Sequence, residues 1–312
     1  MSTVTAVVPC HNGGRFLPEC LESILDQDGL PEPPEVIVVD DRSSDPETLT
    51  ALREWATHPR VKVVSSEGPP GPGAARNTGI RHAGGNWIAF LDADDVWLPG
   101  ALSARFSILK VYPDAAFLSA DFAHLHEDGR IDEAFFRTRP GTCKFLQPAF
   151  ASGKPMRLER PVEPFLDAML THTCVLMARR ELLTRLGGFD ESLRRAQDIH
   201  LWLRLAARAD MHFTPQVVAY YRQHEGSLTH EEEARRKWSI RGVRKHLDDP
   251  LLRPYRGILK ESLARYHIEN TYYHRARADR LKALQAAIGA CRWNPLSTAV
   301  WRVLAGTLLG RP

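Results

Sequence analysis

The chain has 312 residues, of which 43% are hydrophobic, and a formal net charge of +3. These values allow a large hydrophobic core, exclude a disordered chain and give no reason to expect a nucleic-acid partner. The five scattered cysteines form no Cys-x-x-Cys pair, which fits buried thiols in a reducing compartment better than disulfides or a zinc site. No signal peptide and no run of transmembrane length is recognisable, so we expect a cytoplasmic protein.

Strands and helices alternate through the first part of the chain. Short apolar runs rich in β-branched residues predict strands over residues 4–9, 35–41, 61–64 and 87–91. Apolar residues at helical spacing predict helices over residues 16–25, 46–55 and 74–84. This alternation is typical of a parallel sheet that helices cover on both faces. Ligands bind such sheets at the carboxyl ends of the strands, so the residues that follow each strand are candidates for a binding site.

Three carboxylates directly follow the apolar run that ends at Leu91, namely Asp92, Asp94 and Asp95. Carboxylates so close together repel one another unless a positive group lies among them, and Mg²⁺ or Mn²⁺ prefers carboxylate oxygens. The small Ala93 permits a sharp turn, through which Asp92 and Asp94 can reach one ligand. The alternative is an acidic loop that caps the helix expected next.

The pattern continues with elements of the same domain up to residue 222. We expect further helices over residues 99–111 and 179–186 and from Asp198 onward, and further strands over 115–122, 171–178, 211–214 and 217–222. Residues 127–164, rich in Arg, Pro and Gly, predict loops or a hairpin over the active edge of the sheet, where binding specificity resides.

Two other charged residues are candidates because of their positions. Arg76 follows the stiff loop EGPPGPG, which can deliver its guanidinium to a phosphate or to the acidic cluster. The alternative for Arg76 is a solvent-exposed helix arginine. Asp198 stands at the start of an amphipathic helix, where it either caps the helix or faces the acidic strand ends and takes a proton from a substrate hydroxyl.

Four segments in this order resemble a family 2 inverting glycosyltransferase with the GT-A fold: VVPCHNGGRFLPECLESIL, EVIVVDDRSSD, GPGAARNTGIRHAGGNWIAFLDADD and GGFDESLRRAQDIHLWLRLA. The resemblance implies an α/β GT-A fold with a Rossmann-like, mostly parallel sheet covered by helices. The catalytic domain is then expected over residues 1–228 and a helical C-terminal extension over 229–312.

The resemblance also implies roles for single residues. In this family the Asp-x-Asp acids, here Asp92 and Asp94 around Ala93, hold the nucleotide-sugar through its ribose and a Mn²⁺ or Mg²⁺ ion. The end of the first strand borders the base, the acid after the second strand bonds the base, and the arginine of an Ala-Arg-Asn segment lies near the nucleotide. The nucleotide-sugar-binding residues implied are Pro9, His11, Asp41, Arg76, Asp92, Ala93 and Asp94.

The acid of the family's Glu-Asp pair is the catalytic base, which implies that role for Asp198. His224, in YYRQHEGSLT, stands where some relatives place a histidine near the metal or the diphosphate, so the implied metal site is Asp94, Asp92 and His224. The alternative for His224 is a solvated loop histidine.

Two positions depart from the family pattern. His11 stands where tyrosine is usual, which would weaken stacking on the base or make it pH-sensitive. Gln197 replaces the usual glutamate before the base, which removes a neighbouring charge and leaves the tuning of Asp198 open. Nothing matches the QxxRW segment of processive synthases, so transfer of a single sugar is expected.

The function expected is therefore metal-dependent, inverting, hexosyl-type transfer from a nucleotide-sugar, by family frequency a UDP-sugar, to a hydroxyl of a saccharide or lipid-linked acceptor. Surface polysaccharide or glycolipid assembly is the expected context. Two alternatives stay open, a nucleotidyltransferase and a non-catalytic nucleotide-sugar-binding subunit.

The C-terminal part is helical and basic, and three tryptophans are interleaved, Trp238, Trp293 and Trp301. One interpretation is peripheral docking at the inner face of the membrane, since basic faces with Trp anchors suit an anionic interface. The others are packing on the catalytic domain and a homodimer formed through these helices.

Overall fold

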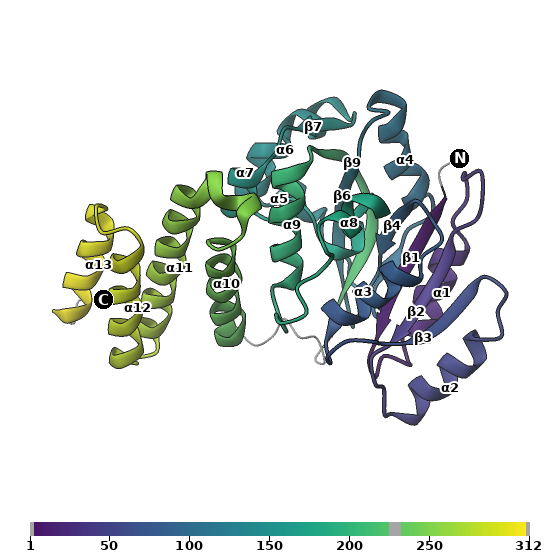
Figure 1. Ribbon diagram of the computed structural model, residues 1–312, viewed down its shortest axis with the longest axis horizontal. Helices are drawn as coiled ribbons and strands as arrows, with labels where there is room; N and C mark the ends of the chain where they lie inside the picture. The colour runs from purple at the N-terminus through teal and green to yellow at the C-terminus, as the bar shows by residue number, and fades with distance from the viewer. Residues whose placement is uncertain (1–2, 225–231, 310–312) are drawn as a thin grey trace. The chain divides into compact units, whose positions relative to one another are not determined.

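The computed structural model describes residues 3–224 and 232–309. Contacts between Cα atoms divide the chain into two compact units, Met1–Ser227 and Leu228–Pro312. The first unit contains all the sequence motifs, and the second is helical wherever it is described as regular structure (Figure 1).

A nine-stranded sheet forms the centre of the first unit within the described residues, in the order β3-β2-β1-β4-β8-β6-β9-β5, with β7 paired to β9. The strands are β1 Val4–Cys10, β2 Glu35–Asp40, β3 Val61–Ser65, β4 Trp87–Phe90, β5 Val96–Trp97, β6 Phe117–His126, β7 Met156–Leu158, β8 Met177–Arg179 and β9 Met211–Gln223. The side chains of β4 are buried along the whole strand, which explains its continuous apolar sequence.

Strand directions bring the functional loops to one edge of the sheet. Strands β1 to β4 are mutually parallel. Strand β8 runs antiparallel to both β4 and β6, so β6 and its parallel neighbour β9 run in the same direction as β4. The carboxyl ends of β1, β2, β4, β6 and β9 therefore lie along the same edge. This confirms the predicted mostly parallel α/β sheet.

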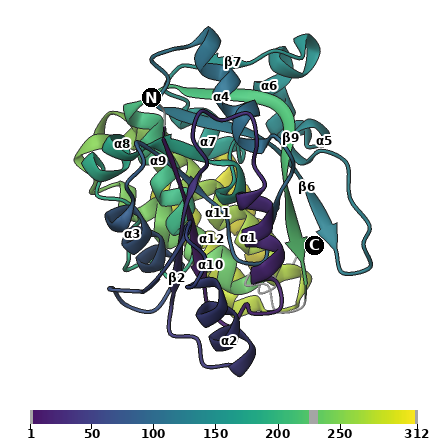
Figure 2. The same ribbon diagram turned by 90° about the vertical axis from the view of Figure 1, so that its right-hand side faces the viewer.

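Helices cover both faces of the sheet, as Figure 2 shows for α1 and α3 on either side of β2. The helices of the first unit are α1 Leu17–Leu25, α2 Pro46–Trp55, α3 Pro72–His82, α4 Ala101–Val111, α5 Phe135–Thr138, α6 Pro140–Ser152, α7 Val162–Asp167, α8 Arg180–Arg185 and α9 Gln197–Arg208. Helix α2 begins as its sequence indicates, because the Asp45 carboxylate accepts a hydrogen bond from the Thr48 amide at 2.8 Å.

Three predictions for the second half of this unit are wrong, wholly or in part. The predicted hairpin forms only at the start of residues 127–164, where Leu125 pairs with Ile131, and most of the remaining residues form α5, α6, β7 and the start of α7. Helix α6 forms because Thr142, Leu146 and Ala149 recur at helical spacing and are buried. The strand expected over 171–178 is a short 3-10 helix, Thr173–Val175, followed by β8. The two strands expected over 211–222 are one strand, β9, whose register on β6 shifts where Pro215 lacks an amide to pair.

The second unit contains α10 Glu232–His246, a 3-10 helix Pro250–Tyr255, α11 Arg256–Ala276, α12 Arg280–Trp293 and α13 Thr298–Leu308. Its core includes Ala264 of α11, Ala290 and Cys291 of α12, and Val300 of α13. No helix of the described residues is both long and apolar enough to cross a bilayer.

Candidate active site

The loops that follow β1 and β2 are tied together at the carboxyl edge. His11 Nδ1 lies 2.8 Å from the backbone oxygen of Asp41. The side-chain oxygen of Asn12 accepts the amide of Ser44 at 2.8 Å. Pro9 is partly buried near the end of β1, so both residues predicted to border the base lie at the strand end.

Asp41 joins the end of β2 to the loop before α3. Its Oδ2 accepts the Gly71 amide at 2.6 Å, and its Oδ1 accepts Arg42 Nη1 at 2.9 Å. Arg42 also donates from Nη2 to the Gly68 carbonyl at 2.6 Å and has a left-handed backbone, with a φ of 63°. A left-handed φ is costly for a residue other than glycine, and such strain gathers at binding sites.

Arg76 is not a solvent-exposed helix arginine, since only 3% of it is exposed. Its Nη2 donates to Asp92 Oδ1 at 2.5 Å, and its guanidinium lies over the ring of Phe189, 5.4 Å from the ring centroid. Among the described residues, Nε and Nη1 of this side chain are buried without a hydrogen-bond partner. A buried guanidinium with free N–H groups is suited to bind phosphate oxygens.

The three acids of the loop after β4, Asp92, Asp94 and Asp95, each interact with a different residue. His224, at the end of β9, brings its Nε2 within 2.9 Å of Asp94 Oδ2, so this histidine is not a solvated loop residue. Burial raises the pKa of Asp94, and the neighbouring charge of Asp92 raises it further. Ala93 between the two acids is buried, as expected for the residue at a tight turn.

Arg222 fixes this acidic loop from β9. Its amide donates to Asp95 Oδ1 and its Nε to the Asp94 carbonyl, both at 2.9 Å. Burial raises the pKa of Asp95 well above its usual range, with a further contribution from Asp94. The contacts of Arg222 join residues far apart in sequence, and no local pattern indicated them.

Asp198 lies in the first turn of α9, directly after Ala196 and Gln197. Ala196 has a left-handed backbone, with a φ of 60°. The Asp198 carboxylate accepts the Ile199 amide at 2.8 Å. Burial raises the pKa of Asp198, the positive charge of Arg76 lowers it, and the charge of Asp92 raises it. Asp198, Arg76 and Asp92 therefore share one electrostatic environment.

Helix α3 and the loop before α9 are locked together by Asn77. Its Nδ2 donates to the Phe189 carbonyl at 2.9 Å, and its Oδ1 accepts the Phe189 amide at 2.8 Å. Gly188 has a φ of 68°, and a Cβ atom there would lie 2.3 Å from Asn77 Oδ1. Sequence reasoning missed Asn77 and Phe189, although the adjacent Ala-Arg-Asn and Gly-Gly-Phe segments were signals.

Gln197 packs against α3 and is only 6% exposed. A Cβ atom on Gly73 would lie 3.3 Å from its Cγ, which shows how closely the two segments approach. Its Oε1 is buried without a hydrogen-bond partner among the described residues. A neutral amide at this position avoids burying a second negative charge beside Asp198.

An aromatic cluster lies near the ends of β6 and β9. The His172 ring lies 4.8 Å from Phe122 and 4.7 Å from Tyr221, measured between centroids. Burial lowers the pKa of His172 to about 4, while the charge of Asp92 raises it and that of Arg76 lowers it. A neutral imidazole and aromatic rings thus stand beside the charged groups. Sequence reasoning missed His172 because its segment was predicted to be a strand.

The acids after β4 are of the chemical type that a divalent cation binds, although in the part of the chain that the structure describes the ligand atoms of Asp92, Asp94 and His224 do not all lie within 4.8 Å of one another. Asp92 and Asp94 offer carboxylate oxygens, the ligands that Mn²⁺ and Mg²⁺ prefer. The raised pKa of Asp94 comes from burial and from the negative charge of Asp92, and a cation would relieve both. The imidazole of His224 is a softer ligand than a carboxylate for these ions. Its Nε2 lies where it can donate a hydrogen bond to Asp94 or to a bound diphosphate.

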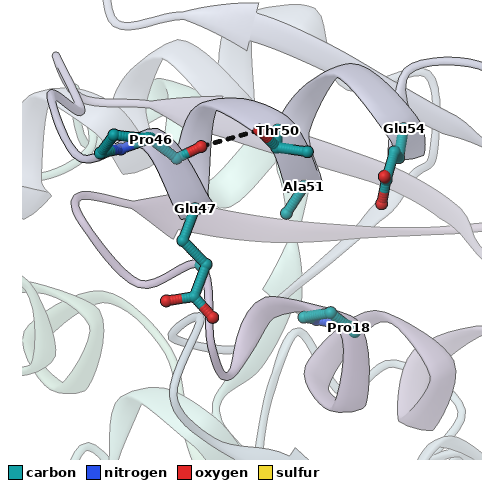
Figure 3. A pocket seen from close by; sticks show the side chains of 7 residues that line it. Pro18, Pro46, Glu47, Thr50, Ala51 and Glu54 are labelled. Carbon is teal, nitrogen blue, oxygen red and sulfur yellow. Dashed lines mark hydrogen bonds between the residues drawn. The ribbon is translucent and has the colours of Figure 1, made fainter.

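A separate hollow of about 460 Å³ lies between α1 and α2 (Figure 3). It is lined by Gly14, Pro18, Pro46, Glu47, Thr50, Ala51 and Glu54. None of these is a predicted site residue, and the two glutamates disfavour a phosphate there.

Residues 5–183 match the family described as glycosyl transferase family 2. This match covers more than half of the 312 residues, and the chain belongs to that family. The resemblance drawn from the sequence motifs is thereby confirmed, and membership favours sugar transfer over the nucleotidyltransferase alternative.

Relatives and solved structures agree with this family. The chain is 32% identical over 229 residues to the succinoglycan biosynthesis protein ExoO of Rhizobium meliloti (strain 1021), covering 72% of this chain and 62% of ExoO. It therefore spans less than two thirds of that protein. Residues 1–349 of S. aureus TarS, solved with UDP, are 18% identical, with a TM-score of 0.66 over 99% of this chain and 87% of that one.

A third similar protein is the mannosyltransferase PcManGT of Pyrobaculum calidifontis, solved with GDP-Man and Mn²⁺. It is 23% identical, with a TM-score of 0.59 over 99% of this chain and 80% of that one. At these identities TarS and PcManGT show that the fold is shared, and they confirm the predicted GT-A architecture.

Proposed function

We propose that this chain is a metal-dependent, inverting glycosyltransferase that moves one hexosyl unit from a nucleotide-sugar to an acceptor hydroxyl. The observation that carries the proposal is the grouping of Arg76, Asp92 and Asp198. The buried Arg76 guanidinium binds Asp92 and has two nitrogens without a partner among the described residues, while Asp198, whose pKa is raised, stands in the same environment. Transfer from a nucleotide-sugar requires a group that binds the anionic diphosphate and a group that accepts the proton of the acceptor hydroxyl.

The donor occupies the carboxyl edge of the sheet. Pro9 and His11 border the base, Asp41 bonds it, and Asp92 with Ala93 and Asp94 receives the ribose and diphosphate. Arg76 donates to phosphate oxygens with the nitrogens that have no partner among the described residues. UDP is the nucleotide proposed, and the UDP complex of the structurally similar TarS is consistent with it.

Asp94 and Asp92 hold the Mn²⁺ or Mg²⁺ ion, with His224 as a third ligand or as a donor to the diphosphate. When bound, the ion offsets negative charge on the leaving diphosphate. Manganese in the PcManGT complex favours Mn²⁺ as the first ion to test.

Asp198 acts as the base. Its carboxylate accepts the proton of the acceptor hydroxyl while that oxygen forms a bond to the anomeric carbon of the donor. The bond from the anomeric carbon to the nucleoside diphosphate breaks on the opposite side, which inverts the configuration at this carbon. The raised pKa of Asp198 makes its carboxylate a stronger base than an exposed aspartate.

The acceptor is a saccharide or a lipid-linked saccharide in surface polysaccharide or glycolipid assembly. Similarity to ExoO, named for succinoglycan biosynthesis, supports this context. The rings of His172 and Tyr221, at the same edge as Asp92, provide the aromatic surface expected of a site for a neutral ligand.

Thermal melting against a panel of nucleoside diphosphates, with and without Mn²⁺, tests the donor site. Ligands that bind the native state raise the melting temperature by mass action. We expect UDP at about 100 times its Kd, with Mn²⁺, to raise the melting temperature by several degrees. The shift should vanish in Asp94→Ala and persist in Asp114→Ala, a control at an exposed acid between α4 and β6.

Absence of a shift with every nucleotide would contradict the proposal. Tight, Mn²⁺-dependent binding without turnover on any donor would instead favour the non-catalytic binding subunit, for which Gln197 in place of glutamate is the one indication.

A further inference from the structure

Helix α13 has two apolar faces, and only one of them packs within the part of the second unit that the structure describes. Val300 and Val303 are 1% and 6% exposed and face inward, where Val300 joins the core with Ala290 and Cys291. A helix with a single core-facing stripe needs no further apolar residues. Those on its other side therefore call for a separate explanation.

The second face is formed by Leu296, Trp301, Ala305 and Leu308, which we term the α13 surface. Leu296, Trp301 and Leu308 are 93%, 51% and 67% exposed. Trp301, Ala305 and Leu308 recur at i, i+4 and i+7 and so lie on one side of the helix. The Trp301 indole N–H donates to the Pro295 carbonyl at 2.7 Å, which holds the ring beside the turn that carries Leu296. Exposed apolar side chains gathered in this way mark an interaction surface.

The chain segment that carries this surface has charges of one sign. Between residues 280 and 309 the sequence contains no aspartate or glutamate, and its cations are Arg280, Lys282, Arg292 and Arg302. Arg292 and Arg302 are exposed, and Arg302 directly follows Trp301. Over the whole chain, by contrast, 41 Lys and Arg balance 38 Asp and Glu. The positive charge is thus a local property of α12 and α13.

We infer that the α13 surface docks on an anionic lipid bilayer, with α13 lying in the plane of the interface. Helices that bind in this way combine Trp and Leu on one side with Arg or Lys beside them. At 11 residues α13 is too short to span the hydrocarbon core. A second copy is a poorer partner, because a two-fold interface through this surface would bring the exposed Arg292 and Arg302 of one copy toward the same side chains of the other. The inference does not rest on the proposed reaction.

Co-sedimentation of the full chain with lipid vesicles tests this inference. The probes are vesicles of phosphatidylcholine alone and vesicles of equimolar phosphatidylcholine and phosphatidylglycerol. We expect binding to the mixed vesicles, weakening as salt is added, and far less binding to phosphatidylcholine. Trp301→Ser with Leu308→Ser should lower the partition coefficient by about tenfold or more, since both side chains leave the interface.

The pair Arg292→Gln with Arg302→Gln provides an independent variant, because it leaves every apolar side chain of α13 unchanged. It should also lower binding to the mixed vesicles by about tenfold. The matched control is Val111→Ser with Ile131→Ser, two apolar residues of the first unit that are 57% and 47% exposed. This control should bind vesicles as the parent does.

Equal vesicle binding by the parent and both α13 variants would overturn the inference. Failure of the parent to bind the mixed vesicles would also overturn it. If light scattering then showed a parent dimer that Trp301→Ser with Leu308→Ser dissociates, the α13 surface would be an interface between two copies instead. UDP-dependent melting of each variant reports on the donor site separately, so failure of membrane docking and failure of the proposed transferase function are distinguishable.

Discussion

The acidic loop after β4 and the start of α9 both present carboxylates at the carboxyl edge of the sheet, but their partners differ. Asp92 is bonded to Arg76 and Asp94 to His224. Asp198 accepts a hydrogen bond only from the Ile199 amide, as far as the described residues show. Burial is the largest cause of a raised pKa at both Asp94 and Asp198.

This difference separates binding from proton transfer. A carboxylate that a neighbouring side chain holds by a hydrogen bond is fixed in position, which suits a ligand for a cation or a ribose. The Asp198 carboxylate has no such side-chain partner among the described residues, which leaves it open to a substrate hydroxyl. The same residue type can therefore serve two tasks in one site, as the proposed reaction requires.

Among the variants that test the difference between the acidic loop and the start of α9, loss of the Arg76 guanidinium should have the largest effect. Arg76→Gln removes the partner of Asp92 and the two nitrogens assigned to phosphate, so we expect the KM for the donor to rise about 100-fold. Steady-state kinetics over a range of donor concentrations measures it. Arg81→Gln, on the same helix but with a side chain that is 47% exposed, should leave KM within about twofold. An unaltered KM in Arg76→Gln would remove Arg76 from the donor site.

The link between the two carboxylate regions can be broken at Gly188. Gly188→Ala places a Cβ against Asn77 Oδ1 and imposes a left-handed backbone on alanine, so we expect the free energy of unfolding to fall by about 2 kcal/mol or more. Chemical denaturation measures this change. Gly187→Ala is the matched control, because its φ is 75° but nothing lies within 4 Å, and it should cost only about 1 kcal/mol. Equal losses in the two variants would mean that the Asn77 contact does not lock the segments.

The shift of the acidic limb of the pH profile is the smallest of the three expected effects. Because the active form of Asp198 is ionised and its pKa is raised, kcat/KM should fall about tenfold per pH unit below that pKa. The acidic limb should lie above the ordinary range of aspartate. The sign for stability is opposite, since a raised native pKa favours the folded state at low pH and costs stability as pH rises through it. A limb at the ordinary aspartate pKa would show that burial does not tune this base.

Much of this site could be predicted because its residues stand in short, recognisable sequence patterns. The apolar run that ends at Leu91 indicates both a buried strand and the point at which the acids follow it, and Asp198 comes after a turn marked by Gly187 and Gly188. The strand order that brings these ends together follows from parallel pairing, which alternating strands and helices already indicate.

What could not be predicted depends on contacts between distant segments. Asn77 is hydrogen-bonded to Phe189 and Arg222 to Asp95, although more than a hundred residues separate the partners in each pair. A periodic sequence pattern does not indicate such pairs. Helix α6 could not be predicted from its residues alone, because its Pro and Gly content favours loops and its helical spacing becomes decisive only once Leu146 is buried. His172 was missed for a related reason, since only the fold places it between Phe122 and Tyr221.

The most direct test of the central claim is the rate of sugar transfer by Asp198→Asn, measured beside its affinity for UDP. We expect transfer to fall by about 10³-fold or more while the Kd for UDP with Mn²⁺ stays within about twofold. The variant should also melt at a higher temperature at neutral pH, because an amide carries none of the cost of burying an ionised carboxylate. Transfer at the parent rate by a folded Asp198→Asn would contradict the assignment of the base.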